Sequence, residues 1–239
     1  MDRRHYLRSL AVPAVAGSAG CLGVLGSAGA EGTVLGPPDQ DLSEASHPSY
    51  GDELPHIAVP DPITGKTVST AAYEGERAVL WTSFYTMCPD GVCPALIFRL
   101  RRVQEVAAEK GYGDETAFLA LTFDPERDTA DVLSEYADQQ GVNLEAGNWH
   151  FLRPESYERG QELLDEQFGL VIEKADADEY ENLSYRFPHY GLILLANTEG
   201  IVERAYPRGP QTDVERLVND VERFGTGCLS RRHLLVRAA

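Results

Sequence analysis

Two cysteines separated by four residues carry the most reactive chemistry in this sequence. Cys88 and Cys93 lie in the segment 86–94, Thr-Met-Cys-Pro-Asp-Gly-Val-Cys-Pro, directly after an apolar run and directly before an amphipathic one. Pro94 suits the first turn of a helix, where its missing N–H costs nothing, so the sequence predicts Cys93 at the N-cap position. A thiol there faces unpaired amide donors and the positive end of the helix dipole, so we expect a lowered pKa and a thiolate at Cys93. Thiolate is the form that attacks disulfides and binds metal ions.

A loop must bring the two sulfur atoms together. On one ideal helix, positions five residues apart point about 140° away from each other. Pro89, Asp90 and Gly91 supply the turn-forming residues that such a loop needs. A cysteine pair of this kind can be a redox couple, a metal site or, in an exported protein, a structural disulfide. The residues alone leave all three open.

Predicted strands lie on both sides of the cysteine pair. Apolar runs typical of buried strands occupy residues 77–84 and 116–123, and a shorter one covers 149–152. Residues 190–196 and 201–206 flank the sequence Asn-Thr-Glu-Gly, which predicts a hairpin.

Predicted helices alternate with these strands. Apolar residues fall on a helical stripe in four stretches, marked by Leu96, Leu100, Val103 and Ala107, by Val132, Leu133, Tyr136 and Ala137, by Tyr157, Leu164 and Phe168, and by Val214, Leu217, Val218 and Val221. The order of elements predicts an α/β fold, with parallel strands at the centre of the sheet and helices on both of its faces.

The N-terminal residues predict export. Arg3 and Arg4 precede the uncharged stretch 9–30, which is rich in Gly, Ala and Ser and therefore too weakly hydrophobic for a typical membrane span. The twin arginines and the Tyr-Leu-Arg that follows resemble a twin-arginine (Tat) signal, and Ser-Ala-Gly-Cys21 resembles a lipobox whose cysteine becomes lipidated. Residues 1–21 are thus predicted to be a lipoprotein signal that leaves the protein anchored on the extracytoplasmic face of the cell membrane. An uncleaved weak anchor is the alternative.

The remaining sequence divides into a linker, one domain and a tail. Residues 22–50 are rich in Gly, Pro, Ser and acids without a sustained period, which predicts a flexible linker. Residues 51–225 are expected to fold. Residues 226–239 are predicted to be a basic tail. The tail contains Cys228, which is expected to be a free thiol because the other three cysteines have assigned roles.

The charge of the chain argues against nucleic-acid binding. Lysine and arginine number 21 against 38 aspartate and glutamate residues, which gives a formal net charge of −17. Nucleic-acid affinity comes mainly from clustered positive charge, so a general binder is disfavoured. Only three of the basic residues are lysines. Acid excess with scarce lysine suggests a protein adapted to high salt, where screening removes most of the mutual repulsion.

Three separated patches resemble the Sco/SenC family, whose members are thioredoxin-fold proteins that bind copper and help to mature the copper centre of terminal oxidases. The patches are Cys-Pro-Asp with Cys-Pro at 88–94, Phe-Asp-Pro-Glu-Arg-Asp-Thr at 123–129, and His189 before an apolar strand. The resemblance covers about residues 50–225. Two features depart from the family pattern: four residues rather than three separate the cysteines, and Pro188 precedes the histidine in place of a small or acidic residue.

The resemblance implies a copper site made by Cys88, Cys93 and His189. Soft thiolates select Cu(I), and an added imidazole also tolerates Cu(II). Asp90 and Asp124 are expected at the edge of the site, where a carboxylate could orient His189, although both could equally cap helices or form turns.

Three further residues near these patches have weaker assignments. Met87 is a possible soft ligand, but a core position at the strand end is favoured. Arg127 and Asp128 are expected to pair with each other or to cap the helix that follows.

The leading hypothesis is a metallochaperone that passes copper to an oxidase subunit by ligand exchange. The alternative is a thiol-disulfide oxidoreductase in which Cys88 and Cys93 act as a redox pair on partner proteins. A peroxidase is a weaker possibility, and a lipoprotein with a purely structural disulfide is the third hypothesis. A cis bond before Pro188 could help to position His189.

Overall fold

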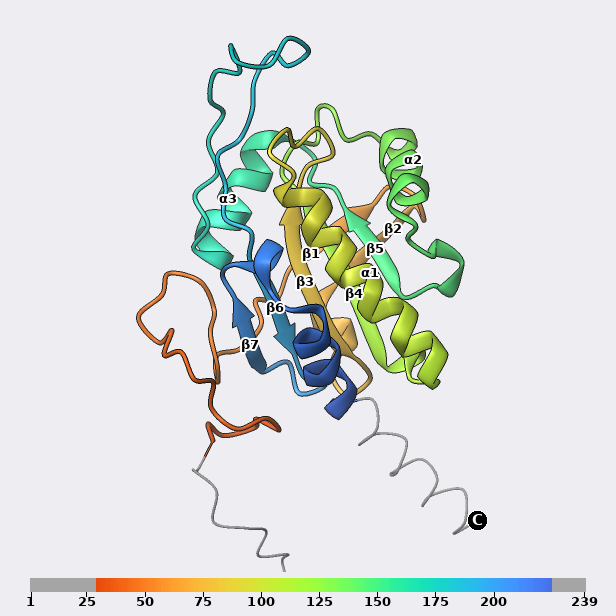
Figure 1. Cartoon of the computed structure of the whole chain (residues 1–239), viewed down its shortest axis with the longest axis vertical. Helices are drawn as coiled ribbons and strands as arrows, with labels where there is room; N and C mark the ends of the chain where they lie inside the picture. Colours follow the sequence, from red (N-terminus) through yellow and green to blue (C-terminus); the bar gives the residue numbers. More distant parts are fainter. Residues whose placement is uncertain (1–28, 225–239) are drawn as a thin grey trace, which may run out of the picture.

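The computed structural model describes residues 29–224 (Figure 1). The predicted lipoprotein signal with Cys21, the first residues of the predicted linker and the basic tail with Cys228 lie outside the described residues. Within the described part, no helix is both long enough and apolar enough to cross a lipid bilayer.

A five-stranded mixed sheet forms the centre of the molecule. Its strands, in spatial order, are β5 (Trp149–Leu152), β4 (Thr116–Thr122), β3 (Ala78–Phe84), β6 (Ile193–Ala196) and β7 (Val202–Tyr206). β3, β4 and β5 are parallel, whereas β6 runs antiparallel to both β3 and β7. Every residue of β3 and β4 is buried, as expected for strands covered on both faces. The expected sheet, with parallel strands at its centre and a hairpin formed by its last two strands, is confirmed.

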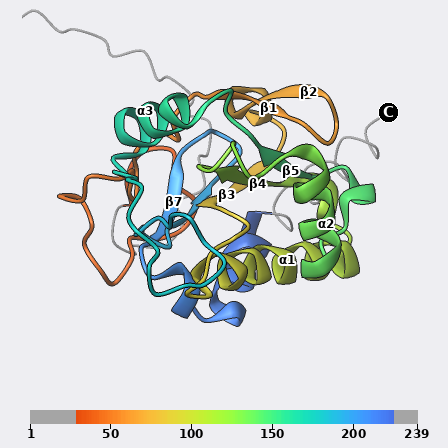
Figure 2. The same ribbon diagram turned by 90° about the horizontal axis from the view of Figure 1, so that it is seen from above.

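Helices cover both faces of this sheet (Figure 2). The helical segments are α1 (Val92–Lys110), α2 (Ala130–Gln140), α3 (Tyr157–Phe168) and residues 214–224. α1, α2 and the last helix lie on one face, and α3 lies on the other beside a small hairpin of β1 (Ala58–Asp61) and β2 (Lys66–Ser69). Trp81 of β3 stacks on Phe168 of α3 with ring centroids 4.0 Å apart, which fixes α3 to its face.

The strand predicted over 190–196 is shorter than expected. β6 begins only at Ile193, and residues 169–192, called here the histidine loop, contain no helix and only one isolated bridge, between Ala175 and Arg186. Gly191 explains the late start, because its backbone packs against the turn after β7: its carbonyl accepts from Gly209 N at 2.6 Å, and a Cβ there would lie 2.4 Å from Pro210.

Residues 29–50 differ from the flexible linker expected for this part of the chain. They have no helix or strand, yet they are fastened to the edge of the sheet by Glu203 of β7, a fully buried acid. Its carboxylate accepts hydrogen bonds from the backbone N–H groups of Val34 at 2.6 Å and Leu35 at 2.8 Å. A buried carboxylate needs such donors, and a low-complexity composition does not reveal them.

Candidate metal centre

Two loops at one end of the sheet bring three soft or borderline ligand atoms together. The loop between β3 and α1 carries Cys88, the first turn of α1 carries Cys93, and the histidine loop carries His189. Their sulfur and nitrogen atoms all lie within 4.8 Å of one another. Cys93 Sγ is 3.2 Å from His189 Nε2, and the backbone N–H of Cys93 donates to Cys88 Sγ at 3.3 Å. The additional residue between the cysteines therefore does not keep the sulfur atoms apart.

The imidazole of His189 is held with one nitrogen facing the sulfurs. Its Nδ1 lies 2.8 Å from the carbonyl oxygen of Phe187. A carbonyl only accepts, so Nδ1 carries a proton, and Nε2 is the nitrogen that can give its lone pair to a metal ion once it is deprotonated. The ring also packs against Tyr85 and Phe123, with centroids 5.5 and 5.2 Å away.

The helix starts earlier than the sequence predicted. The N-cap of α1 is Gly91, with φ of 77°, and Cys93 is the second residue of the helix. Asp90 causes this early start because its carboxylate accepts from the backbone N–H of Val92 at 3.1 Å. Glycine fits this position because it adopts the left-handed conformation without steric cost.

The two thiols have opposite acidities. Burial raises the pKa of Cys93, whose residue is 0% exposed, and the neighbouring Cys88 raises it further. The pKa of Cys88 falls to about 6, chiefly because the Cys93 thiol donates a hydrogen bond to it, with further help from His189. The expectation of a lowered pKa at Cys93 is thus wrong: the structure places the thiolate at Cys88.

The pKa of His189 is raised. Burial lowers it, but the hydrogen bonds with Cys88 and with the Phe187 carbonyl, together with the negative charges of Cys88 and Asp90, outweigh burial. The imidazole and the Cys88 thiolate therefore stabilise each other's charged form in the metal-free protein.

The three ligand atoms suit one soft or borderline transition-metal ion. Bonds of about 2.0–2.3 Å to thiolate and imidazole, as zinc makes them, put ligand atoms of a shared ion roughly 3.5–4 Å apart. Here Cys93 Sγ and His189 Nε2 are 3.2 Å apart, and none of the separations exceeds 4.8 Å, so small movements of the side chains suffice to reach that range. Thiolates favour Cu(I), zinc and iron–sulfur clusters, and imidazole suits zinc and copper.

The two carboxylates expected at the edge of the site have different positions. Asp90 is exposed, and its carboxylate lies 2.9 Å from Cys88 Sγ. It accepts a hydrogen bond from Cys88 only while that thiol keeps its proton, so this contact raises the pKa of Cys88 and partly opposes the effect of Cys93. Asp124 is 1% exposed and has no hydrogen bond with His189; its carboxylate binds Arg127 and accepts from the Tyr185 hydroxyl at 2.9 Å. It therefore acts on the loop that carries the histidine rather than on the ring.

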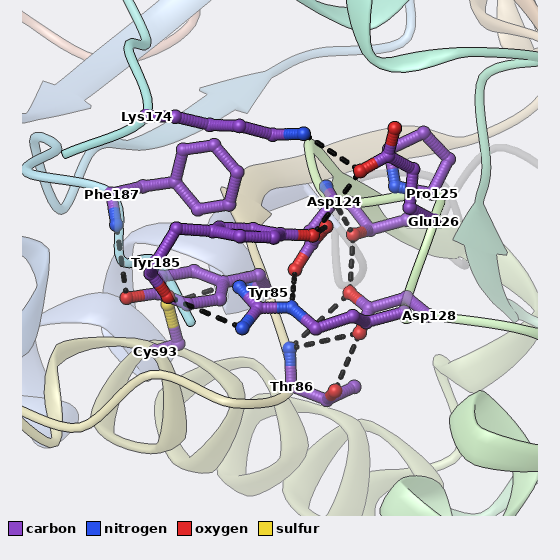
Figure 3. A network of polar contacts seen from close by, with 12 residues as sticks. Tyr85, Thr86, Cys93, Asp124, Pro125, Glu126, Asp128, Lys174, Tyr185 and Phe187 are labelled. Atoms are coloured by element: carbon purple, nitrogen blue, oxygen red, sulfur yellow. Dashed lines mark hydrogen bonds and ion pairs between the residues drawn. The ribbon is translucent and has the colours of Figure 1, made fainter. Parts of the chain in front are cut away.

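Asp128 is a site residue that sequence reasoning underrated. It neither pairs with Arg127 nor caps α2, whose N-cap is Thr129. It is fully buried and accepts from the backbone N–H of Thr86 at 3.2 Å and from the hydroxyls of Thr86 and Thr122 (Figure 3). Thr86 lies two residues before Cys88, so Asp128 fixes the start of the cysteine loop. The Asp-Pro-Glu-Arg-Asp motif was the available signal.

Two other expectations about this region are wrong. Met87 is 42% exposed and therefore does not occupy the core. No peptide bond among the described residues is cis, so the bond before Pro188 is trans.

The SCO1/SenC family model matches residues 63–225. The chain belongs to the SCO1/SenC family. Among solved structures, it is similar to a SCO1/SenC family lipoprotein from Bacillus anthracis, with TM-score 0.58 and 19% identity over 72% of this chain and 94% of that chain. It is equally similar to copper-bound ScoI from Bradyrhizobium japonicum, with TM-score 0.57 and 20% identity over 72% and 99%.

The chain is also similar to BsSco, with TM-score 0.57 and 21% identity over 73% of this chain and 94% of that chain. BsSco is a member of the Sco family of cytochrome c oxidase assembly proteins and has a disulfide switch. At these identities the likeness shows the fold, and it confirms the thioredoxin-like arrangement. A search of curated protein sequences finds no match.

Proposed function

We propose that this SCO1/SenC protein is a copper metallochaperone that holds one ion between Cys88, Cys93 and His189 and delivers it to a subunit of a terminal oxidase. The convergence of these three ligand atoms within 4.8 Å carries the proposal. Two likenesses support it: ScoI is solved with copper bound, and BsSco is described among cytochrome c oxidase assembly proteins.

The unequal exposure of the ligands suits delivery by ligand exchange. Cys93 is 0% exposed, Cys88 is 9% exposed and His189 is half-buried. A recipient can therefore displace His189 and Cys88 from the open side while Cys93 still holds the ion. No covalent bond within either protein has to break.

Copper titration of the ligand variants tests the proposal. We expect the reduced protein to bind one equivalent of Cu(I) or Cu(II), Cys88→Ser and Cys93→Ser to lose both, and His189→Ala to lose mainly Cu(II). His56→Ala is the matched control, because His56 is exposed and pairs with Glu74 instead. Stoichiometric binding that survives in Cys88→Ser or Cys93→Ser would refute the site.

A thiol-disulfide oxidoreductase is the second candidate, favoured by the lowered pKa of Cys88 beside a buried Cys93. The Cys88 thiolate would attack a partner disulfide and release one partner thiolate. Cys93 would then attack the mixed disulfide, release the second partner thiolate and leave a Cys88–Cys93 disulfide. His189→Ala separates the candidates: loss of Cu(II) binding without loss of disulfide reduction would show that the two activities are distinct.

We further propose that the protein acts at the extracytoplasmic face of the membrane, anchored through lipidated Cys21 after Tat export. The lipobox-like sequence and the likeness to the lipoprotein from Bacillus anthracis support this location. Cys21→Ser is expected to move the protein from the membrane to the soluble fraction. Replacing Arg3 and Arg4 by lysine is expected to block export, and unchanged fractionation of both variants would contradict the proposal.

A further inference from the structure

The position of His189 depends on side-chain contacts. The histidine loop has no helix, and its single isolated bridge lies between Ala175 and Arg186. Close to His189, the backbone of the loop bonds to the backbone of another element at Gly191, whose carbonyl accepts from Gly209 N at 2.6 Å. The residues before His189 rely on side chains instead. A residue that holds this loop against the rest of the molecule therefore affects the position of His189 relative to the two cysteines.

Tyr185 joins this loop to the connection between β4 and α2 through both its hydroxyl and its ring. Its hydroxyl donates to Asp124 at 2.9 Å and lies 3.3 Å from Glu126. Figure 3 shows the ring extending from the loop toward these two carboxylates, with the end of Lys174 beside Glu126. Two cations also lie over the Tyr185 ring. The guanidinium carbon of Arg127 is 3.8 Å from the ring centroid, and Lys174 Nζ is 4.5 Å from it.

Arg127 completes this contact from the other side. One of its terminal nitrogens donates to the backbone carbonyl of Tyr185 at 3.2 Å, while its Nε binds the buried carboxylate of Asp124. A planar guanidinium provides both bonds and the ring contact at once, which a lysine cannot reproduce.

The anchored loop leads directly to the ligand. Phe187 is 1% exposed, packs edge-on against Tyr185 at 5.5 Å, and donates its N–H to the Tyr85 hydroxyl at 3.4 Å. Its carbonyl then accepts from His189 Nδ1. A continuous set of contacts thus connects Arg127 to the imidazole, and none of its members before His189 touches the metal position.

We propose that Arg127 and Tyr185 are positioning residues that hold His189 at the cysteine pair and thereby set the affinity for Cu(II) relative to Cu(I). The inference rests on the proposed copper-binding function. Two thiolates satisfy Cu(I), whereas Cu(II) gains more from the imidazole. Releasing the loop therefore weakens the binding of Cu(II) selectively, by roughly the 10–100-fold that outer contacts of metal ligands typically contribute.

The test compares three variants with one matched control. Tyr185→Ala removes the ring and the hydroxyl, and Tyr185→Phe removes the hydroxyl alone. Arg127→Gln is combined with Asp124→Asn, because the single change would leave a buried carboxylate unpaired. Tyr180→Phe is the control, since this tyrosine lies on the same loop and its hydroxyl has no hydrogen bond to any described residue.

Each purified protein is measured for Cu(I) affinity, Cu(II) affinity and the thiolate-to-Cu(II) absorption band, and its metal-free form for amide exchange over 169–192. We expect Tyr185→Ala and the double variant to lose about 10–100-fold in Cu(II) affinity, to change the absorption band and to exchange faster in the loop, with Cu(I) affinity retained. The Cu(II) affinity and the amide-exchange rate of Tyr185→Phe should lie between those of Tyr185→Ala and of the wild type. Tyr180→Phe should match the wild type in every measurement.

Wild-type Cu(II) affinity in Tyr185→Ala, or an equal fall of Cu(I) and Cu(II) affinity, would overturn the inference. A wild-type protein that binds neither ion would instead refute the proposed function. The metal-free exchange measurement stands apart from both, because it reports whether Tyr185 fastens the loop at all.

Discussion

The same side chain, a cysteine thiol, behaves differently at two positions five residues apart. Cys88 is slightly exposed and receives hydrogen bonds, so its thiolate is stabilised. Cys93 has no exposure and lies beside that negative charge, so its proton is retained. Cys88 is therefore the thiol that can react with an incoming partner. In the two proposed functions, Cys93 would keep hold of the copper ion or attack the mixed disulfide formed at Cys88.

Alkylation should detect this difference directly. We expect iodoacetamide to modify Cys88 with a rate that is half-maximal near pH 6, because its pKa is about 6, and to leave Cys93 unmodified in the folded protein. Mass spectrometry of peptides sampled between pH 4 and 9 measures both rates.

Two variants check the cause. Cys93→Ala removes the largest stabilising hydrogen bond and should shift the midpoint for Cys88 upward. Asp90→Asn replaces the carboxylate whose hydrogen bond from the Cys88 thiol raises the pKa of Cys88, and it should shift the midpoint downward. Faster modification of Cys93 than of Cys88 would contradict the assignment.

The sequence allowed us to predict that the three candidate ligand residues lie together, but not which thiol ionises. Cysteines before a helix and a histidine before a late strand are visible in the chain itself. The burial of Cys93 is not visible, because it depends on residues distant in sequence such as His189, and on Asp90 starting the helix early. Acidity follows from three-dimensional surroundings that a local pattern does not contain.

At the level of elements, a single acid joins the ends of two parallel strands. Asp128 accepts hydrogen bonds from Thr86, after β3, and from Thr122, the last residue of β4. Both strand ends therefore keep the spacing that the cysteine loop requires. The cost is a buried carboxyl group, and burial raises the pKa of Asp128 to about 6.

The stability of the metal-free protein should depend on this acid. A folded-state pKa above the ordinary value of about 3.9 favours folding while the group is protonated, so its contribution is complete below about pH 4 and is lost as the pH rises through 6. The loss amounts to roughly 3 kcal/mol by pH 7. Asp128→Asn should reduce the fall in unfolding free energy between pH 4 and 7 by about that amount, as measured by urea unfolding.

Asp131→Asn is the control, because Asp131 is an exposed acid in the first turn of α2. The same pH dependence in the wild type and in Asp128→Asn would show that Asp128 does not carry the effect.

Glu203 should decide whether residues 29–50 stay on the domain. Glu203→Gln replaces an acceptor-only carboxylate with an amide that cannot accept from Val34, Leu35 and Asn197 together. We expect a loss of about 1–3 kcal/mol in unfolding free energy and faster proteolytic cleavage within 29–50. Glu215→Gln, at an exposed position, is the control. Unchanged cleavage would mean that other contacts retain the segment.

The buried elements were predictable and the peripheral ones were not. β3 and β4 are continuous apolar runs, and α1 to α3 show regular apolar stripes, so periodicity identifies them. The β1–β2 hairpin was missed because its strands are only four residues long, contain Pro60 and have few apolar residues. The attachment of residues 29–50 depends on one distant acid, which no local pattern reveals.

For the whole molecule, charge is the dominant feature. A net charge of −17 opposes the compact state through mutual repulsion, which salt screens. We expect the urea midpoint to rise between about 0.1 M and 1 M KCl, over which the screening length falls from about 10 to 3 Å. Potassium chloride is the right salt, because sulfate stabilises proteins in general. A midpoint that is constant or falls with KCl would contradict this account.

The direction in which the chain enters the domain limits which acceptors it can serve. Figure 1 shows the described chain beginning near one end of the molecule, whereas α1, with the cysteines at its start, begins at the opposite end. If Cys21 carries a lipid, the chain from Cys21 to residue 29 has eight Cα-to-Cα steps, which span at most about 28 Å. A domain of this size is about 40 Å across. If the domain stands with residue 29 toward the bilayer, the end that carries Cys88, Cys93 and His189 faces away from the lipid headgroups. An acceptor would then have to present its own ligands at that height, on a portion that projects from the bilayer.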